Sequence, residues 1–280
     1  MLLQENPVRA HRVRLAGIPV SEVCFGTEHI NRSVPKFGAG ILEDAARLHG
    51  ITFWDTDNAY GSQTQVACAL RRFPREEIAI TSKTYGRSRE EAEYDLTRTL
   101  RELETPYLDF FLLHEVAAGT LSEKMPAFAY MLEMQKKGLV RAVGLSTHCA
   151  PVISAAADIP EIQVVCAPFN REGSRIEEGS LLDMENALCK AHSKGKGVYV
   201  IKVLGKGELT YDIRGALAWA LERREFLDAY NLGVANLSEA RENLTIFNEL
   251  AHGEEARARR RWGKTAWSSP SSTRDTTPSR

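Results

Sequence analysis

Residues 51–61 read ITFWDTDNAYG, and this stretch decides the fold. The apolar run ITFW leads into Asp55, and a polar loop that contains Tyr60 and Gly61 follows at once. A short apolar run without alternation is typical of a parallel strand, because helices cover both faces of such a strand. The pattern therefore places Asp55 and Tyr60 at the carboxyl end of a strand, where α/β barrels carry their chemistry.

The same unit, an apolar strand followed by an amphipathic helix, occurs eight times in the chain. We predict strands over residues 21–26, 51–56, 78–83, 108–114, 139–146, 162–168, 197–203 and 227–233. We predict helices over residues 38–50, 64–73, 88–103, 122–138, 151–158, 180–195, 212–224 and 238–250. A hairpin over residues 13–23, with Gly17-Ile18-Pro19 as its turn, precedes the first unit. This order predicts an α/β fold, a closed (β/α)8 TIM barrel with an N-terminal β-hairpin.

Two local signals support the helix ends. Ser88 and Glu91 have the spacing of a capping box, and Gly50, Gly138 and Gly195 stand where glycine ends a helix. The strand–helix pattern stops near Leu250. We therefore expect residues 1–250 to form the barrel and residues 251–280, rich in Ser, Thr, Arg and Pro, to form a disordered polar tail.

Composition limits the classes of function. With 280 residues, 43% hydrophobic and 26% charged, the chain is typical of a globular protein, and a net charge of −1 does not favour nucleic acid or a membrane surface. No apolar run approaches the length of a transmembrane helix and no signal peptide is evident, so we expect a cytoplasmic protein. The five cysteines form no CxxC pair, which predicts no metal site. We expect a monomer or weak oligomer.

Candidate catalytic residues lie at three successive strand ends. Asp55 and Tyr60 follow the second predicted barrel strand, Lys83 ends the third, and His114 ends the fourth. A tyrosine has an ordinary pKa of about 10, so a nearby cation such as Lys83 is needed to make it acidic enough to protonate a carbonyl oxygen. Asp55 is the expected counter-ion of a buried lysine, and the His114 imidazole can orient a substrate carbonyl. These groups suit carbonyl reduction, which requires a hydride-carrying cofactor.

These residues resemble the aldo-keto reductases. The resemblance rests on an aspartate followed five residues later by Tyr-Gly (Asp55, Tyr60, Gly61), on the strand-end lysine of ITSK and on the strand-end histidine of LLHEV. It covers roughly residues 12 to 250. The resemblance implies that Tyr60 is the general acid, that Lys83 and Asp55 tune it, and that His114 orients the carbonyl of a small-molecule aldehyde or ketone.

The family also implies NADPH, with NADH as the alternative. On the phosphate and adenine side, the resemblance points to the loops after the seventh and eighth strands. There, Gly205 and Gly207 allow close backbone approach to a pyrophosphate, Ser238 is expected to cap the last helix, and Arg241 is expected to pair with a 2′-phosphate. The expected cofactor-binding residues are Ser146, Thr147, Cys166, Lys202, Leu204, Gly205, Lys206, Gly207, Ser238, Arg241 and Asn243.

The nicotinamide side departs from the family pattern. Thr147, Cys166 and Ile201 stand where members often have asparagine, glutamine and an aromatic residue. The usual C-terminal substrate loop is also absent or replaced by the polar tail, which predicts an open, weakly selective pocket. By position, we expect the pocket to be lined by Glu28, His29, Ile30, Glu115, Val116, Phe169 and Asn170.

Two other functions are compatible with the residues. The altered nicotinamide side is compatible with a protein that binds or senses the cofactor with little turnover. Lys83 is also the residue type that a Schiff-base lyase or isomerase uses, although Asp55 beside it would hold the amine in its charged form.

Overall fold

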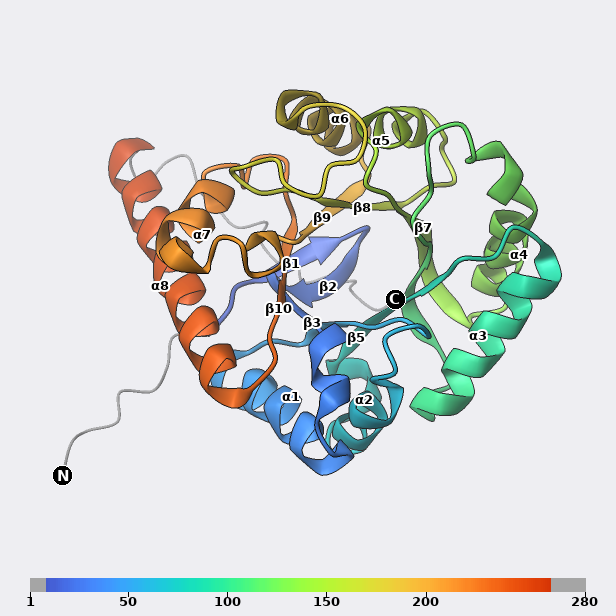
Figure 1. Ribbon diagram of the computed structural model, residues 1–280, viewed down its shortest axis with the longest axis horizontal. Helices are drawn as coiled ribbons and strands as arrows, with labels where there is room; N and C mark the ends of the chain where they lie inside the picture. Colours follow the sequence, from blue (N-terminus) through green and yellow to red (C-terminus); the bar gives the residue numbers. More distant parts are fainter. Residues whose placement is uncertain (1–8, 263–280) are drawn as a thin grey trace, which may run out of the picture.

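Eight parallel strands close into a barrel in the computed structural model, which describes residues 9–262 (Figure 1). Around the barrel the order is β10-β3-β4-β5-β6-β7-β8-β9, so neighbours in sequence are neighbours in the sheet. The strands are β3 (Val23–Gly26), β4 (Phe53–Asp55), β5 (Ala79–Thr84), β6 (Leu108–Leu113), β7 (Val140–Ser146), β8 (Val164–Pro168), β9 (Gly197–Ile201) and β10 (Ala229–Gly233). The predicted TIM barrel is confirmed, and each strand lies inside its predicted range except β5, which extends one residue further, to Thr84.

An antiparallel hairpin closes the amino-terminal end of the barrel. It consists of β1 (Arg12–Leu15) and β2 (Ile18–Ser21), with Leu15 opposite Ile18. Ala16 and Gly17 form the two-residue turn with φ of 47° and 80°, the positive values that suit the twist of a tight hairpin. The hairpin side chains pack against residues at the starts of the barrel strands, such as Phe53 and Phe110, and form an inner apolar core.

Helices surround the barrel and bury a second, larger core between themselves and the strands (Figure 1). The α-helices are α1 (Pro35–His49), α2 (Gln63–Leu70), α3 (Arg89–Leu103), α4 (Met125–Lys136), α5 (Ala150–Ala157), α6 (Leu181–Ser193), α7 (Ile213–Leu221) and α8 (Leu237–Trp262). Short 3-10 helices are η1 (Glu28–Arg32), η2 (Arg75–Glu77), η3 (Ser122–Lys124), η4 (Gly205–Gly207) and η5 (Thr210–Asp212).

The predicted helix ends follow their local signals. Ser88 accepts a hydrogen bond from the Glu91 amide, and the Glu91 side chain accepts one from the Ser88 amide, which completes the capping box of α3. Gly50 ends α1 with φ of 73°, a left-handed conformation that glycine adopts without strain. The described residues include no helix long and apolar enough to cross a membrane.

The last helix differs from its prediction in length and in its cap. We predicted disorder from residue 251, but α8 continues to Trp262, while residues 263–280 lie outside the described part of the chain. Ser238 lies inside α8 and does not cap it. Asn236 accepts from the Glu239 amide (3.0 Å), and Glu239 accepts from the Ala235 amide (2.9 Å), so the cap lies two residues earlier.

Candidate active site

Strand ends bring the four predicted catalytic residues to one end of the barrel. Asp55 is the last residue of β4, Lys83 is the penultimate residue of β5, and His114 follows β6 directly. Tyr60 comes from the loop between β4 and α2. Because β4, β5 and β6 are adjacent parallel strands, their carboxyl ends meet at this face of the barrel.

Lys83 is the centre of the cluster. Its ammonium group forms an ion pair with Asp55 Oδ1, and both side chains are buried. The Lys83 Nζ also donates to the Thr56 carbonyl (3.1 Å) and reaches the Tyr60 Oη at 3.4 Å. The lysine therefore links a buried carboxylate to a phenol at the pocket surface. Burial opposes the charge on Lys83, but Asp55, Tyr60 and Asp57 outweigh it and raise the pKa of the lysine well above its usual value.

Tyr60 is protonated in the free protein, although Lys83 acts to lower its pKa. Burial raises the pKa of Tyr60 above its ordinary value, the Lys83 charge lowers it, and the carboxylates of Asp55, Asp57 and Glu28 raise it again. The carboxylates offset the effect of the lysine because Asp55 lies against its ammonium group. Tyr60 is consequently protonated at neutral pH, which is the form that donates a proton.

His114 is neutral and held by a strand neighbour. Its side chain is only 4% exposed, and burial followed by the charge of Lys83 lowers its pKa well below the usual value, with Lys202 acting in the same direction. His114 Nδ1 lies 2.6 Å from Ser146 Oγ at the end of β7. Ser146 Oγ also accepts from the Glu115 amide at 3.4 Å. When the Ser146 hydroxyl donates its hydrogen to His114 Nδ1, Nδ1 is the acceptor, and the ring proton of the neutral imidazole is on Nε2.

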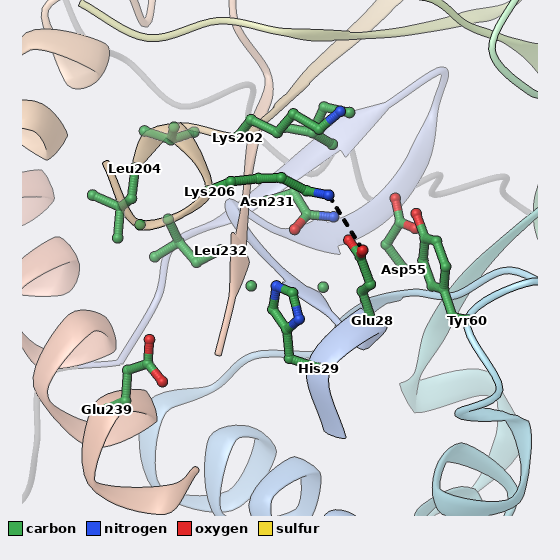
Figure 2. Close-up of a pocket in the computed structure, with 15 residues that line it drawn as sticks. Glu28, His29, Asp55, Tyr60, Lys202, Leu204, Lys206, Asn231, Leu232 and Glu239 are labelled. Atoms are coloured by element: carbon green, nitrogen blue, oxygen red, sulfur yellow. Dashed lines mark hydrogen bonds and ion pairs between the residues drawn. The ribbon is translucent and has the colours of Figure 1, made fainter. Parts of the chain in front are cut away.

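A pocket lies at the carboxyl ends of β3, β4, β9 and β10 (Figure 2). Asp55 and Tyr60 lie on one side of it, and the segment after β9 lies on the other. Its lining residues are Gly26, Glu28, His29, Asp55, Tyr60, Ile201, Lys202, Val203, Leu204, Lys206, Gly207, Asn231, Leu232, Gly233 and Glu239. The cavity therefore runs from the phenol of Tyr60 to the loops in which the resemblance placed the cofactor phosphates.

Two of the seven residues expected by position to line the pocket do so. Glu28 and His29 line the pocket. Ile30, Val116 and Phe169 instead belong to the apolar core between barrel and helices. The remaining two, Glu115 and Asn170, do not line this pocket, and Asn170 is buried.

Several residues of the site have no sequence signal that distinguishes them from core residues. Tyr199 Oη, buried inside the barrel, donates to Asp55 Oδ2 (2.9 Å), so Asp55 is held by two donors. Asn231 in β10 lines the pocket and lies so close to Gly26 that a Cβ at position 26 would come within 2.4 Å of its Oδ1. Asp57 is buried, with one carboxyl oxygen that lacks a hydrogen-bond partner among the described residues. The position of Asp57 two residues after Asp55, in the run Asp-Thr-Asp, is the sequence feature that associates it with the site.

Of the residues predicted to contact the nicotinamide, Lys202 lines the pocket and Ser146, Thr147 and Cys166 do not. Lys202 lines the pocket, whereas Ser146 bonds to His114. Thr147 is buried and donates to the Val116 carbonyl (2.5 Å). Cys166 is buried among the inner barrel side chains, and burial raises the pKa of its thiol to about 12. Neither Thr147 nor Cys166 lines this pocket.

The predicted phosphate and adenine residues fall into two groups. Leu204, Lys206 and Gly207 line the pocket, and the Lys206 ammonium lies 3.4 Å from Glu28 (Figure 2). Gly205 is buried in the same turn, with φ of 62°. The residues from α8 (Ser238, Arg241 and Asn243) do not line it.

Two α8 residues bear on the fit of the cofactor. Arg241 forms an ion pair with Asp44 of α1 and is therefore occupied in this structure. Asn243 Oδ1 is buried without a hydrogen-bond partner among the described residues, and an adenine amino group would satisfy such an acceptor. Together with the ammonium groups of Lys202 and Lys206 in the pocket, this orphaned oxygen is compatible with an extended, anionic dinucleotide.

Comparison with known proteins gives a consistent result. The family model described as "Aldo/keto reductase family" matches residues 22–255. An aldo-keto reductase of Mycolicibacterium paratuberculosis is 33% identical over 130 residues, 43% of this chain and 45% of that protein. Mouse aldo-keto reductase family 1 member A1 is 26% identical over 221 residues, 64% of each chain. A methylglyoxal reductase of Salmonella typhi is 26% identical over 211 residues, 68% of this chain and 79% of that protein.

Solved structures show the same fold. The holo form of an aldo-keto reductase from Bacillus halodurans superposes with a TM-score of 0.70 at 17% identity, over 88% of this chain and 96% of that one. A candidate aldo-keto reductase from Pseudomonas aeruginosa gives a TM-score of 0.74 at 22% identity, over 88% and 98%. The chain spans less than two thirds of the length of the first two sequence relatives, at 45% and 64%.

Proposed function

The chain belongs to the aldo/keto reductase family, and from this premise we propose that it reduces an aldehyde or ketone with a nicotinamide cofactor and with Tyr60 as proton donor. The observation that carries the proposal is the contact of the Lys83 ammonium with both Asp55 and the Tyr60 phenol, at the edge of a pocket. A buried lysine that is paired with a carboxylate and contacts a tyrosine is an arrangement that suits proton transfer from the phenol to a carbonyl oxygen.

The reduced nicotinamide, when bound, would supply a hydride to the carbonyl carbon. The carbonyl oxygen then becomes an alkoxide, a strong base that takes the Tyr60 proton even though burial keeps the phenol weakly acidic. Lys83 Nζ, 3.4 Å from the Tyr60 Oη, stabilises the phenolate that remains. Asp55 and Tyr199 keep the lysine in place and charged throughout the step.

His114 supplies orientation. In its neutral form, the ring nitrogen that does not face Ser146 can donate a hydrogen bond to the substrate oxygen. This bond would polarise the carbonyl and hold its oxygen within reach of Tyr60. A neutral imidazole suits this role, because a protonated one would compete with Tyr60 as the acid.

For the cofactor we propose NADPH, with NADH as the weaker donor. Lys206 and the turn over residues 204–207 are proposed to meet the pyrophosphate, and Asn243 the adenine. Arg241 would bind the 2′-phosphate by exchanging part of its contact with Asp44, a surface ion pair of the kind that exchanges at little free-energy cost. Ser146, Thr147, Cys166 and Ser238 remain proposed cofactor contacts on the resemblance alone.

Replacement of the proposed acid tests the function. Tyr60→Phe removes one hydroxyl and is expected to lower the turnover of an aldehyde panel at least a hundredfold, because general acid catalysis contributes about 10²–10⁴ in rate. NADPH affinity, measured by fluorescence titration, should stay within twofold of the wild type. Tyr94→Phe, an equal change at an exposed tyrosine of α3, serves as the control. Undiminished reduction by the Tyr60 variant would sink the proposal.

Two alternatives yield different results. A cofactor-binding or sensing protein is favoured by Thr147, Cys166 and Ile201, and predicts saturable NADPH binding without turnover across the panel. A Schiff-base enzyme at Lys83 is disfavoured by the ion pair with Asp55, which raises the pKa of the lysine and keeps its amine protonated.

A further inference from the structure

Lys202 is the first residue after β9 and is held in an uncommon backbone conformation. Its φ is 59°, in the left-handed region that residues other than glycine seldom adopt. The Lys202 carbonyl accepts hydrogen bonds from Asn170 Nδ2 (3.1 Å) and from the Gly205 amide (2.8 Å), which fix this conformation. A non-glycine residue kept in this region by its surroundings often marks a functional position.

The Lys202 side chain is aimed by a histidine and a glutamate. Lys202 Nζ lies 2.7 Å from His148 Nε2, and His148 Nδ1 lies 3.1 Å from Glu177 Oε1. An ammonium group only donates, so His148 Nε2 accepts and the ring proton resides on Nδ1, facing Glu177. The imidazole is neutral in this arrangement. It therefore orients the lysine without neutralising its charge.

Lys202 has no carboxylate ion-pair partner within residues 9–262. In the described part of the chain no ion pair includes it, whereas Lys206 in the same pocket is paired with Glu28. Glu115 and Glu28 act on Lys202 only from beyond ion-pair distance. Burial and the charge of Lys206 lower the pKa of Lys202, so its charged form is under-stabilised in the free protein. An anion at this position would restore the balance.

The position of this cation relates it to the substrate rather than to the far end of the cofactor. Lys202 lines the same pocket as Asp55 and Tyr60, and its charge lowers the pKa of His114, the imidazole proposed to orient the carbonyl. In Figure 2 the Lys202 side chain extends from the segment after β9 toward the side of the pocket where Asp55 and Tyr60 lie. An anionic group on Lys202 would thus lie beside the reacting carbonyl.

We propose that Lys202, oriented by His148 and Glu177, binds an anionic group of the substrate, and that the preferred substrates are carbonyl compounds with an adjacent carboxylate, such as 2-oxo acids. This substrate class rests on the proposed reductase function. The anion site itself does not, because it can be measured by binding alone.

A matched ligand pair isolates the charge. Benzoylformate and its methyl ester share the ketone and differ in the charge of the carboxyl group. Calorimetric titration of the full-length protein, with and without saturating NADP⁺, should show benzoylformate binding about tenfold more tightly or better, as expected for a charge-assisted hydrogen bond. Lys202→Met should abolish this preference and Lys202→Arg should retain part of it. Lys194→Met, the same change at the exposed lysine that directly follows α6, should leave the preference intact.

Steady-state rates give the second readout. We expect kcat/KM for benzoylformate to fall about tenfold or more in Lys202→Met, mainly through KM, while kcat/KM for the ester stays within twofold. An unchanged ratio between the two substrates in Lys202→Met, with turnover of both, overturns the anion site and leaves the reductase function standing. Preferential binding of benzoylformate without any turnover would uphold the site and contradict the reductase function.

Two further outcomes would also overturn the proposal. If Lys202→Met weakens NADPH binding tenfold without altering the benzoylformate preference, the anion is a phosphate of the cofactor. If borohydride traps benzoylformate covalently on Lys202, the lysine is a nucleophile that forms an imine with loss of water, and mass spectrometry of the reduced adduct would show it.

Discussion

Asp55 shows how single residues determine the character of the site. One carboxylate oxygen faces the Lys83 ammonium, and the other accepts from the Tyr199 hydroxyl at 2.9 Å. Because both oxygens are occupied and buried, the carboxylate is fixed as a counter-ion and is not available as a base. The lysine is fixed in turn and presents its remaining donor to Tyr60.

The protonation states of Tyr60 and His114 predict a flat pH profile. Burial raises the pKa of the phenol and lowers that of the imidazole, so both groups are neutral across about pH 7–9. We expect the single-turnover rate of carbonyl reduction to vary less than twofold over this range. A sigmoid fall with a midpoint between pH 7 and 9 would show instead that Lys83 makes Tyr60 acidic.

Asp57 is expected to lower stability at neutral pH. Burial raises the pKa of Asp57 to about 6, because the nearby Lys83 charge only partly offsets the cost of burying the carboxylate. A raised folded-state pKa contributes stability below the unfolded value, near pH 4, that is lost as the pH rises through about 6. Asp57→Asn removes this titration. Its free energy of unfolding relative to wild type should therefore rise by about 2 kcal/mol between pH 4.5 and 7.5.

Urea denaturation of both proteins at the two pH values measures this difference. Because other titrating groups are common to wild type and variant, their contributions cancel in the comparison. An equal stability difference at both pH values would show that Asp57 does not titrate in this range.

At the scale of the elements, strand ends position the chemistry and strand starts hold the barrel together. Asp109 near the start of β6 is buried and accepts from Arg75 (2.8 Å), Arg141 (2.7 Å) and the Ile80 amide (2.9 Å). These contacts connect β6 to β5, β7 and η2, at the end of the barrel remote from Tyr60. Because it joins neighbouring elements far from Tyr60, we expect this network to stabilise the fold and to take no part in the chemistry.

Removal of this carboxylate should destabilise the fold without affecting the site. Asp109→Ala leaves two arginines without their partner and is expected to cost about 3 kcal/mol of unfolding free energy. Glu104→Ala breaks an exposed ion pair with Arg71 and should leave stability nearly unchanged. Chemical denaturation compares the two. A loss from Asp109→Ala no larger than that from Glu104→Ala would contradict the account of the network.

Sequence patterns predicted the elements well, because periodicity and helix caps are local. The eight strands and the Ser88 capping box needed only neighbouring residues to be recognised. The cap of α8 was misplaced because Asn236 and Ser238 are both good capping residues, and only the backbone path decides between them. The partners of Arg241 and Tyr199, which lie 197 and 144 residues away, depend on barrel closure and leave no local trace.

At the scale of the whole molecule, barrel closure creates both the site and its limits. The hairpin fills one end of the barrel interior with apolar side chains, and the pocket with Tyr60 lies at the opposite end. α8 packs against α1 and α7 and completes the ring of helices (Figure 1). The pocket then extends from β4 to β9 across the barrel mouth, which brings Tyr60 and Lys202 to one cavity from opposite halves of the chain.

Hydride transfer is the central claim, and label transfer in a single turnover tests it most directly. Protein in excess is mixed with an aldehyde and with NADPH carrying deuterium at both C4 positions of the nicotinamide, and the alcohol is analysed by mass spectrometry. The account predicts one deuterium at the former carbonyl carbon with the wild-type protein and almost no alcohol with Tyr60→Phe. Saturable binding of the labelled cofactor with no labelled alcohol from any carbonyl compound would contradict it.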